Sequence, residues 1–125
     1  MALPVTDLGR SIAFYASYAA MQVVHQRAGV VWLSDRTRPF VIVLIETPEV
    51  AAPLLPVAHL GVACASREEV DALCQRAKQE DALVSGPLDY GPPVGYWGFL
   101  RDPDGHTLEV SHGQEVGVAV SEGGG

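Results

Sequence analysis

The stretch Gly95–His112, GYWGFLRDPDGHTLEVSH, decides the fold of this chain. Two apolar runs flank an Asp-Pro-Asp-Gly turn, so the stretch predicts a β-hairpin. Pro103 sets the φ angle for this turn, and Gly105 supplies the residue that takes a positive φ. Glu109 falls in the middle of the second run, where an unpaired carboxylate is costly to bury. We therefore expect Glu109 to have a charged partner, hydrogen bonds or a metal, and it is the first candidate functional residue.

Along the whole chain, with the hairpin closing the second half, the same order of elements occurs twice. The first half predicts a strand at 2–5, a helix that Asp7 caps, and strands at 22–26, 30–33 and 40–46. The second half predicts a strand at 57–64, a helix with the capping box Ser66 and Glu69, a short strand at 82–84, a Gly/Pro-rich loop at 86–94, and the hairpin. An internal repeat of about 50 residues indicates two copies of one structural unit.

The repeat predicts an α+β fold made of two βαβββ modules. We place these modules at residues 1–46 and 57–112, with a proline-containing linker at 47–56. Residues 113–125 are expected to form a flexible tail, in which 116–120 is a candidate docking strand.

Composition excludes several classes of partner. The chain has 125 residues and a formal net charge of -7, which argues against nucleic acid and anionic membranes as partners. No apolar run approaches the roughly 20 residues of a membrane-spanning helix. We expect a cytoplasmic protein, because the N-terminus has no basic leader followed by an apolar segment. Cys64 and Cys74 form no C-x-x-C pair, so we interpret them as buried thiols.

Three motifs, met in order, carry a resemblance to a known family. They are VTDLGRSIAFY at residues 5–15, PVAHLGV at 56–62 and DPDGHTLE at 102–109. In this order and spacing they resemble the vicinal oxygen chelate superfamily, which includes glyoxalases, bleomycin-resistance proteins and extradiol dioxygenases. The resemblance covers residues 1–112 and implies a concave, cup-shaped mixed sheet with the helices outside. Ala20 stands where this family usually has glycine, so we expect the first helix to end differently here.

The resemblance also implies a metal site, of which this sequence matches two positions. In metal-dependent members each module gives ligands from its first and last strands, and His59 and Glu109 match two of them. The first-module histidine would lie immediately before Met1, and the remaining carboxylate position falls on Val43. Glu46 is three residues from Val43 and points to the other face of a regular strand, unless a bulge or an alignment shift intervenes.

A catalytic metal site usually needs three protein ligands, so the predicted site is incomplete. Two alternatives remain for this site. In one, His59 and Glu109 bind a divalent metal (Zn, Ni, Fe or Mn); in the other, they form a metal-free pair. An upstream histidine that completes the site is a third, if Met1 is not the natural start.

A ligand pocket is expected on the same face of the sheet as Glu109. Alternation along the strands places Thr107 and Ser111 on the side of Glu109, and Gly61 on the side of His59. The expected pocket residues are Trp32, Val43, Gly61, Tyr96, Trp97, Thr107 and Ser111. His25, His106 and His112 are expected at the surface or at strand edges, with no role assigned.

Two functions fit this sequence. The first is a binding protein that holds a small organic molecule without turnover. The alternative is a metal-dependent lyase or isomerase of the lactoylglutathione lyase type, or an extradiol dioxygenase, with Glu109 as catalytic ligand or proton-transfer base. Open strand edges predict a homodimer in either case.

Overall fold

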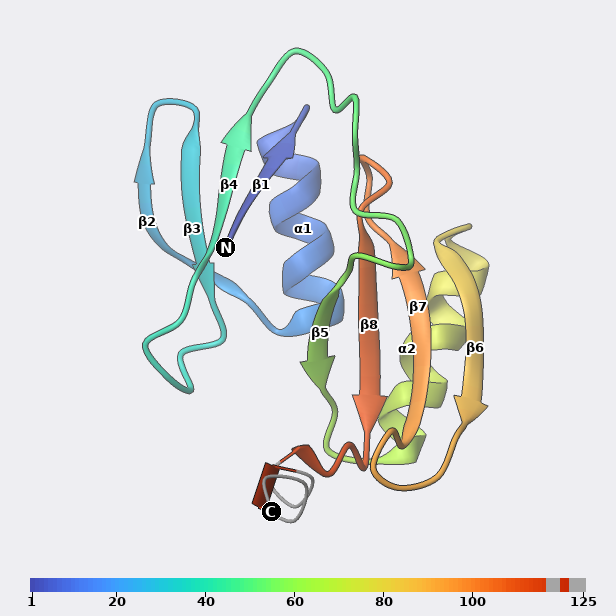
Figure 1. The fold of residues 1–125 in the computed structure, drawn as a ribbon. Coiled ribbons are helices and arrows are strands. Elements are labelled where there is room, and N and C mark those ends of the chain that lie inside the picture. The colour runs from blue at the N-terminus through green and yellow to red at the C-terminus, as the bar shows by residue number, and fades with distance from the viewer. Residues whose placement is uncertain (117–119, 122–125) are drawn as a thin grey trace. The chain divides into compact units, whose positions relative to one another are not determined.

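A computed structural model describes residues 1–116 and 120–121, and its contacts divide the chain into two units (Figure 1). Unit 1 contains Met1–Leu54 together with the short segment Asp102–His106. Unit 2 contains Leu55–Arg101 and the chain from Thr107 onward. No helix in the described part of the chain is both long and apolar enough to cross a membrane.

Unit 1 is a four-stranded mixed sheet with one helix. Its elements are β1 (Ala2–Val5), α1 (Leu8–Ala19), β2 (Gln22–Arg27), β3 (Val30–Ser34) and β4 (Ile42–Glu46). The strand order is β1-β4-β3-β2, in which β1 runs parallel to β4 and the other pairs are antiparallel. Residues alternate between the two faces, so Ile42 and Leu44 are buried while Val43 is half-buried and Ile45 is exposed.

The two ends of α1 follow different rules. Asp7 caps the N-terminus as expected, and its Oδ1 accepts a 3.0 Å hydrogen bond from the backbone N–H of Arg10. At the C-terminus, Ala20 takes the left-handed conformation, with φ 54° and ψ 32°. The helix therefore ends in the left-handed manner typical of glycine, and our expectation of a different ending was wrong.

The turn Asp102–His106 completes the core of unit 1. Asp102 accepts hydrogen bonds from the Tyr15 hydroxyl at 2.8 Å and from the backbone N–H of His106 at 2.9 Å. The His106 ring accepts at Nδ1 from the N–H of Leu54 and donates from Nε2 to the carbonyl of Pro4. His106 is only 1% exposed, so the expectation of a surface histidine was wrong.

Unit 2 repeats the plan with a second helix and sheet. Its elements are β5 (Leu60–Ala63), α2 (Arg67–Gln79), β6 (Leu83–Asp89), β7 (Tyr96–Arg101) and β8 (Thr107–His112). The strand order is β5-β8-β7-β6, with β5 parallel to β8. The buried core is formed by Val70, Cys74 and Ala77 of α2 together with Leu100, Leu108 and Val110. Burial raises the pKa of both thiols, Cys64 and Cys74, to about 11.

The predicted α+β class and the order of elements in both modules are confirmed. The largest differences from the predicted boundaries are at β5 and β6. β5 begins at Leu60 rather than Val57, because a turn that closes from the N–H of Ala58 to the carbonyl of Leu55 precedes it. β6 continues to Asp89 through Gly86, where the pairing with β7 is irregular. Val116 and Val120 are helical rather than extended, and residues 117–119 of the candidate docking strand lie outside the described residues.

Candidate functional site

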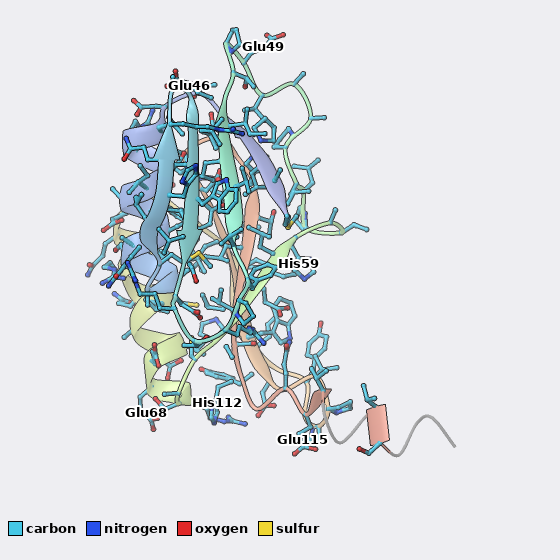
Figure 2. All side chains as sticks on the ribbon, turned by 90° about the vertical axis from the view of Figure 1, so that its left-hand side faces the viewer. Glu46, Glu49, His59, Glu68, His112 and Glu115 are labelled. Atoms are coloured by element: carbon cyan, nitrogen blue, oxygen red, sulfur yellow. The ribbon has the colours of Figure 1, made fainter. Side chains whose placement is uncertain are left out.

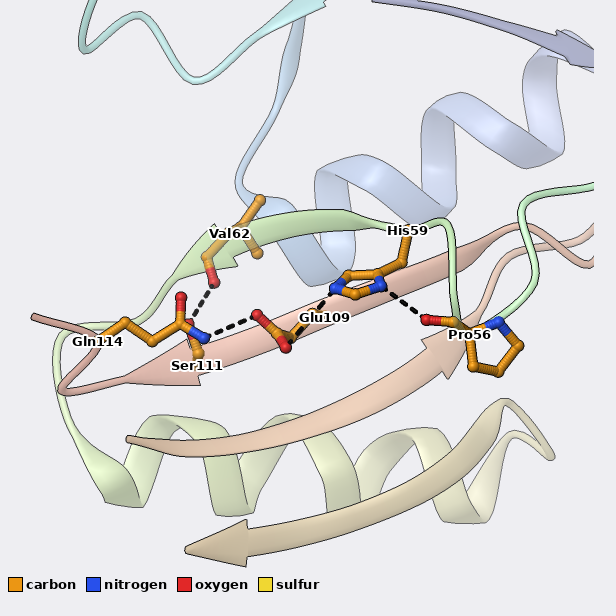
Figure 3. Close-up of polar contacts among 6 residues, drawn as sticks. All are labelled: Pro56, His59, Val62, Glu109, Ser111 and Gln114. Carbon is orange, nitrogen blue, oxygen red and sulfur yellow. Dashed lines mark hydrogen bonds and ion pairs between the residues drawn. The ribbon is translucent and has the colours of Figure 1, made fainter. Parts of the chain in front are cut away.

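His59 and Glu109 lie side by side in unit 2, as the sequence predicted (Figure 3). β5 pairs with β8 so that Gly61 is opposite Glu109, and His59 is the residue immediately before β5. The distance from His59 Nε2 to Glu109 Oε2 is 3.8 Å. This separation is too long for a direct hydrogen bond, but it lets one proton or cation interact with both groups.

The hydrogen bonds of His59 fix the role of each ring nitrogen. Nδ1 lies 2.7 Å from the carbonyl oxygen of Pro56. Because a carbonyl only accepts, Nδ1 must carry the proton. Nε2 is left facing Glu109, and it is the nitrogen through which this ring can bind a metal or exchange a proton.

Glu109 is mostly shielded from water by its neighbours. Its side chain is 13% exposed, and Oε1 accepts a 2.9 Å hydrogen bond from the Gln114 amide (Figure 3). The Cβ that a larger residue would place at position 61 lies 3.6 Å from Oε1, so Gly61 keeps the space beside the carboxylate free.

A row of aromatic rings continues from His59 across the face of the sheet opposite α2. Centroid distances are 4.8 Å for His59–Phe99, 4.7 Å for Phe99–Trp97 and 5.3 Å for Trp97–Tyr90. In the β7–β8 ladder, Phe99 is opposite Glu109 and Trp97 is opposite Ser111. We call His59, Phe99, Trp97 and Tyr90 the aromatic row. Sequence reasoning missed Phe99 and Tyr90, although the alternation that selects Trp97 also selects Phe99.

Tyr96 does not share a face with Trp97, so its assignment to the pocket was wrong. Its hydroxyl donates to Asp71 of α2, and the guanidinium of Arg67 lies 4.7 Å from its ring centroid. Neighbouring residues of a strand point to opposite faces, so Tyr96 and Trp97 could not both line one pocket. The hydrogen bond to Asp71 raises the pKa of Tyr96, and partial loss of solvent contact raises it further.

Thr107 and Ser111 are on the Glu109 side of β8 but are almost fully buried, at 1% and 3% exposed. Neither side chain therefore offers much surface to a ligand. The indole N–H of Trp97 is also buried and has no hydrogen-bond partner among the described residues.

The other predicted site residues, Trp32, Val43 and Glu46, belong to unit 1. Trp32 is opposite Val43 in the β3–β4 ladder, is 38% exposed and packs against His25 at 4.9 Å between ring centroids. β4 pairs with β1 and β3 without a register shift. Glu46, which ends β4 (Figure 2), therefore keeps the parity of Leu44 and points away from the face of Val43, so the bulge that would reverse it is absent.

Within residues 1–116 and 120–121, no group of three or more His, Cys, Asp or Glu side chains could hold a metal ion. His59 and Glu109 provide two donors of the types that divalent transition metals accept, an imidazole nitrogen and a carboxylate oxygen. The described residues thus fit two positions of a metal's coordination shell.

The family model of the Glyoxalase/Bleomycin resistance protein/Dioxygenase superfamily matches residues 1–110. The chain belongs to this superfamily. Its relatives include the uncharacterized protein PA2024 of Pseudomonas aeruginosa, 37% identical over 126 residues, which are 94% of this chain and 89% of that protein.

Solved structures carry the superfamily fold over most of their length. A possible glyoxalase from Bacillus cereus is 26% identical, with a TM-score of 0.71 over 89% of this chain and 94% of that one. The fosfomycin resistance protein FosX from Listeria monocytogenes is 19% identical, with a TM-score of 0.72 over 90% of this chain and 89% of that one. The latter likeness shows the superfamily fold alone.

Proposed function

We propose that this member of the superfamily binds a small, planar organic molecule against the aromatic row, with Glu109 and His59 at one side of the ligand. The observation that supports this proposal is the continuity of the row: three successive ring contacts of 4.7–5.3 Å lie on one face of the sheet beside a shielded carboxylate. Stacked or edge-to-face aromatic pairs each contribute about 0.5–1.5 kcal/mol beyond the area they bury.

The chemistry of this face favours binding over turnover. Flat apolar rings provide contact area, and a few convergent polar groups provide orientation, which is the usual division of labour in a ligand site. Phe99 and Trp97 supply the contact area, and Glu109 and His59 supply the orienting polar groups. Such a protein would resemble the bleomycin-resistance members of the superfamily, with an incomplete metal site at His59 and Glu109.

The test is calorimetric titration with quinoline, a flat neutral probe, at pH 8. We expect saturable binding to the wild-type protein and at least a tenfold loss in Trp97→Ala, because the largest ring of the row is removed. Tyr96→Ala is the matched control, since Tyr96 lies on the same strand as Trp97 but faces α2. Absence of binding to the wild type, or an equal loss in both variants, would overturn the proposal.

A second function is favoured by one specific observation, the anchoring of the His59 ring through Nδ1. A ring that donates from Nδ1 to the Pro56 carbonyl holds Nε2 ready for a metal, and Glu109 Oε2 is 3.8 Å away. In this function His59 and Glu109 would hold a divalent ion, which as a Lewis acid would polarise adjacent oxygens of a substrate in a lyase or dioxygenase reaction. If Glu109 is not a metal ligand, it would act instead as the base that takes a proton from the substrate.

Titration with Zn²⁺ and Ni²⁺ separates the two functions. Two protein ligands leave most of the coordination shell to water, so the binding function predicts weak metal affinity that Glu109→Ala removes. Stoichiometric metal that survives purification, and is lost in both His59→Ala and Glu109→Ala, would favour the enzyme.

We also propose that the protein assembles as a homodimer. The sheets end in the edge strands β1 and β2 in unit 1 and β5 and β6 in unit 2. Such edges favour pairing unless they are covered, and two-fold dimers are the commonest oligomers. Light scattering at micromolar concentration should give twice the 13.3 kDa mass of the chain, and a monomer mass would count against the dimer.

A further inference from the structure

The polar contacts of the Glu109 carboxylate come from an amide and an imidazole. Its Oε1 accepts from the neutral amide of Gln114, and its Oε2 lies 3.8 Å from Nε2 of His59. Among the described residues, no Lys or Arg forms an ion pair with it. The arginines of unit 2 that pair elsewhere include Arg67, with Asp89, and Arg101, with Asp81.

This arrangement has an energetic consequence for any ligand that covers the aromatic row. Glu109 is 13% exposed, and a ligand lying on Phe99 and Trp97 would remove part of its remaining water. Burying a charge is costly unless it gains a partner of opposite charge. A ligand that brings a positive nitrogen supplies that partner, whereas an anion would meet repulsion from Glu109 and from a chain of net charge -7.

The rings favour the same kind of ligand. The faces of Trp, Tyr and Phe carry a negative potential that attracts a cation within about 6 Å of the ring centroid. Trp97, Phe99 and Tyr90 provide three such rings in sequence. We infer that the ligand of this site is an organic cation with a flat ring system, whose positive nitrogen lies against Glu109. This inference rests on the proposed binding function and adds the charge of the ligand.

An apolar cavity adjoins the carboxylate and offers space for the rest of such a molecule. Gln114, which donates to Glu109, also lines a cavity of about 390 Å³ with Pro93, Val94, Val116 and Val120. Volumes of this size are typical of sites for small molecules. Hydrocarbon groups attached to the cation therefore have a place to be buried next to Glu109.

The experiment compares three probes of similar size and different charge: N-methylquinolinium, quinoline and 2-naphthoate, which at pH 8 are a cation, a neutral molecule and an anion. Calorimetry on the full chain should give an affinity for N-methylquinolinium about tenfold or more above that for quinoline, with 2-naphthoate weakest. Added salt should reduce the preference for the cation.

Glu109→Gln keeps the shape of the side chain and removes its charge. We expect it to bring the affinities for N-methylquinolinium and quinoline within about twofold of each other while quinoline binding is retained. Glu68→Gln, on the exposed first turn of α2, removes the same charge elsewhere and should leave the preference intact. Circular dichroism and thermal melts establish that both variants fold.

The outcomes separate this inference from the proposed function. If wild type binds quinoline and N-methylquinolinium equally, and Trp97→Ala weakens both, the binding function stands and the inferred charge is wrong. If Glu68→Gln reduces the preference as much as Glu109→Gln, net charge rather than Glu109 is the cause, and the inference is overturned. If the wild type binds none of the three probes, the proposed function fails and the inference fails with it.

Discussion

The hydroxyl of Tyr15 donates to Oδ2 of Asp102 at 2.8 Å, a contact that joins residues 87 positions apart in the sequence. Both side chains are buried, with Tyr15 at 0% and Asp102 at 4% exposed. The remaining oxygen of Asp102 accepts from the backbone N–H groups of Asp104 and His106. The carboxylate is thus satisfied by three donors, of which only Tyr15 comes from a side chain.

Tyr15→Phe removes one donor from a buried carboxylate. Hydrogen bonds to charged groups contribute about 1.5–3 kcal/mol, so we expect the free energy of unfolding in urea to fall by that amount. Thr6→Val is the control, because it breaks the hydrogen bond from Thr6 to Asp104 in an exposed setting and should cost less than about 1 kcal/mol. Equal losses in the two variants would contradict the special role of the buried pair.

Tyr15 should also make stability depend on alkaline pH. Burial, and then the charge and hydrogen bond of Asp102, raise the pKa of Tyr15 well above the usual tyrosine value of about 10. Above pH 10 the unfolded chain loses the Tyr15 proton while the folded protein keeps it, so stability falls as pH rises. The loss relative to Tyr15→Phe should approach about 1.4 kcal/mol per pH unit. Urea unfolding of both proteins at pH 9, 10 and 11 measures this, and parallel pH profiles would refute it.

Ala20→Gly should stabilise the protein. With a φ of 54°, the backbone of Ala20 is in the left-handed region, which costs a non-glycine residue about 1–2 kcal/mol. Part of this gain is offset by the greater freedom of glycine in the unfolded chain, so we expect a net increase of about 0.5–1 kcal/mol in the free energy of unfolding. Ala19→Gly, one residue earlier inside α1, should have the opposite sign. A lower melting temperature for Ala20→Gly would show that the strain is absent.

Gly98→Ala should be destabilising, and a second substitution should rescue it. A Cβ at position 98 would lie 2.5 Å from Sγ of Cys74, a residue that is itself 2% exposed. Overpacking of this kind typically costs about 1–3 kcal/mol. Cys74→Ala removes the sulfur, so Gly98→Ala should cost at least about 1 kcal/mol less in that background. Gly61→Ala, whose Cβ would meet only Glu109 Oε1 at 3.6 Å, should leave stability nearly unchanged.

Much of the fold was predictable because its signals are local. The Asp7 cap, the capping residues Ser66 and Glu69, and the turn at Asp102–Gly105 each set the local backbone through a hydrogen bond or a φ preference. The side chain of Glu69 bonds to the N–H of Ala65 rather than that of Ser66, a one-residue variation that spacing alone does not distinguish.

The errors arose where tertiary structure overrides local preference. His106 is buried because its two ring nitrogens meet a donor and an acceptor from Leu54 and Pro4, 52 and 102 residues away. Tyr96 is aromatic like Trp97, but the alternation of the strand turns it toward Asp71 of α2. The pairing of His59 with Glu109 was predictable from the family resemblance, whereas the link from Gln114 depends on the path of the chain after β8.

The assignment of Asp102–His106 to unit 1 has a consequence for how the protein is made. During synthesis, the segment 1–54 leaves the ribosome long before the turn Asp102–His106. That turn provides the hydrogen-bond partners of the Tyr15 hydroxyl, the Pro4 carbonyl and the Leu54 N–H. The amino-terminal half therefore remains incompletely packed until most of the chain has been translated. This delay lengthens the time during which chaperones and proteases can act on it. For the same reason, a gene fragment that stops at the linker would encode a half-protein without its own last segment.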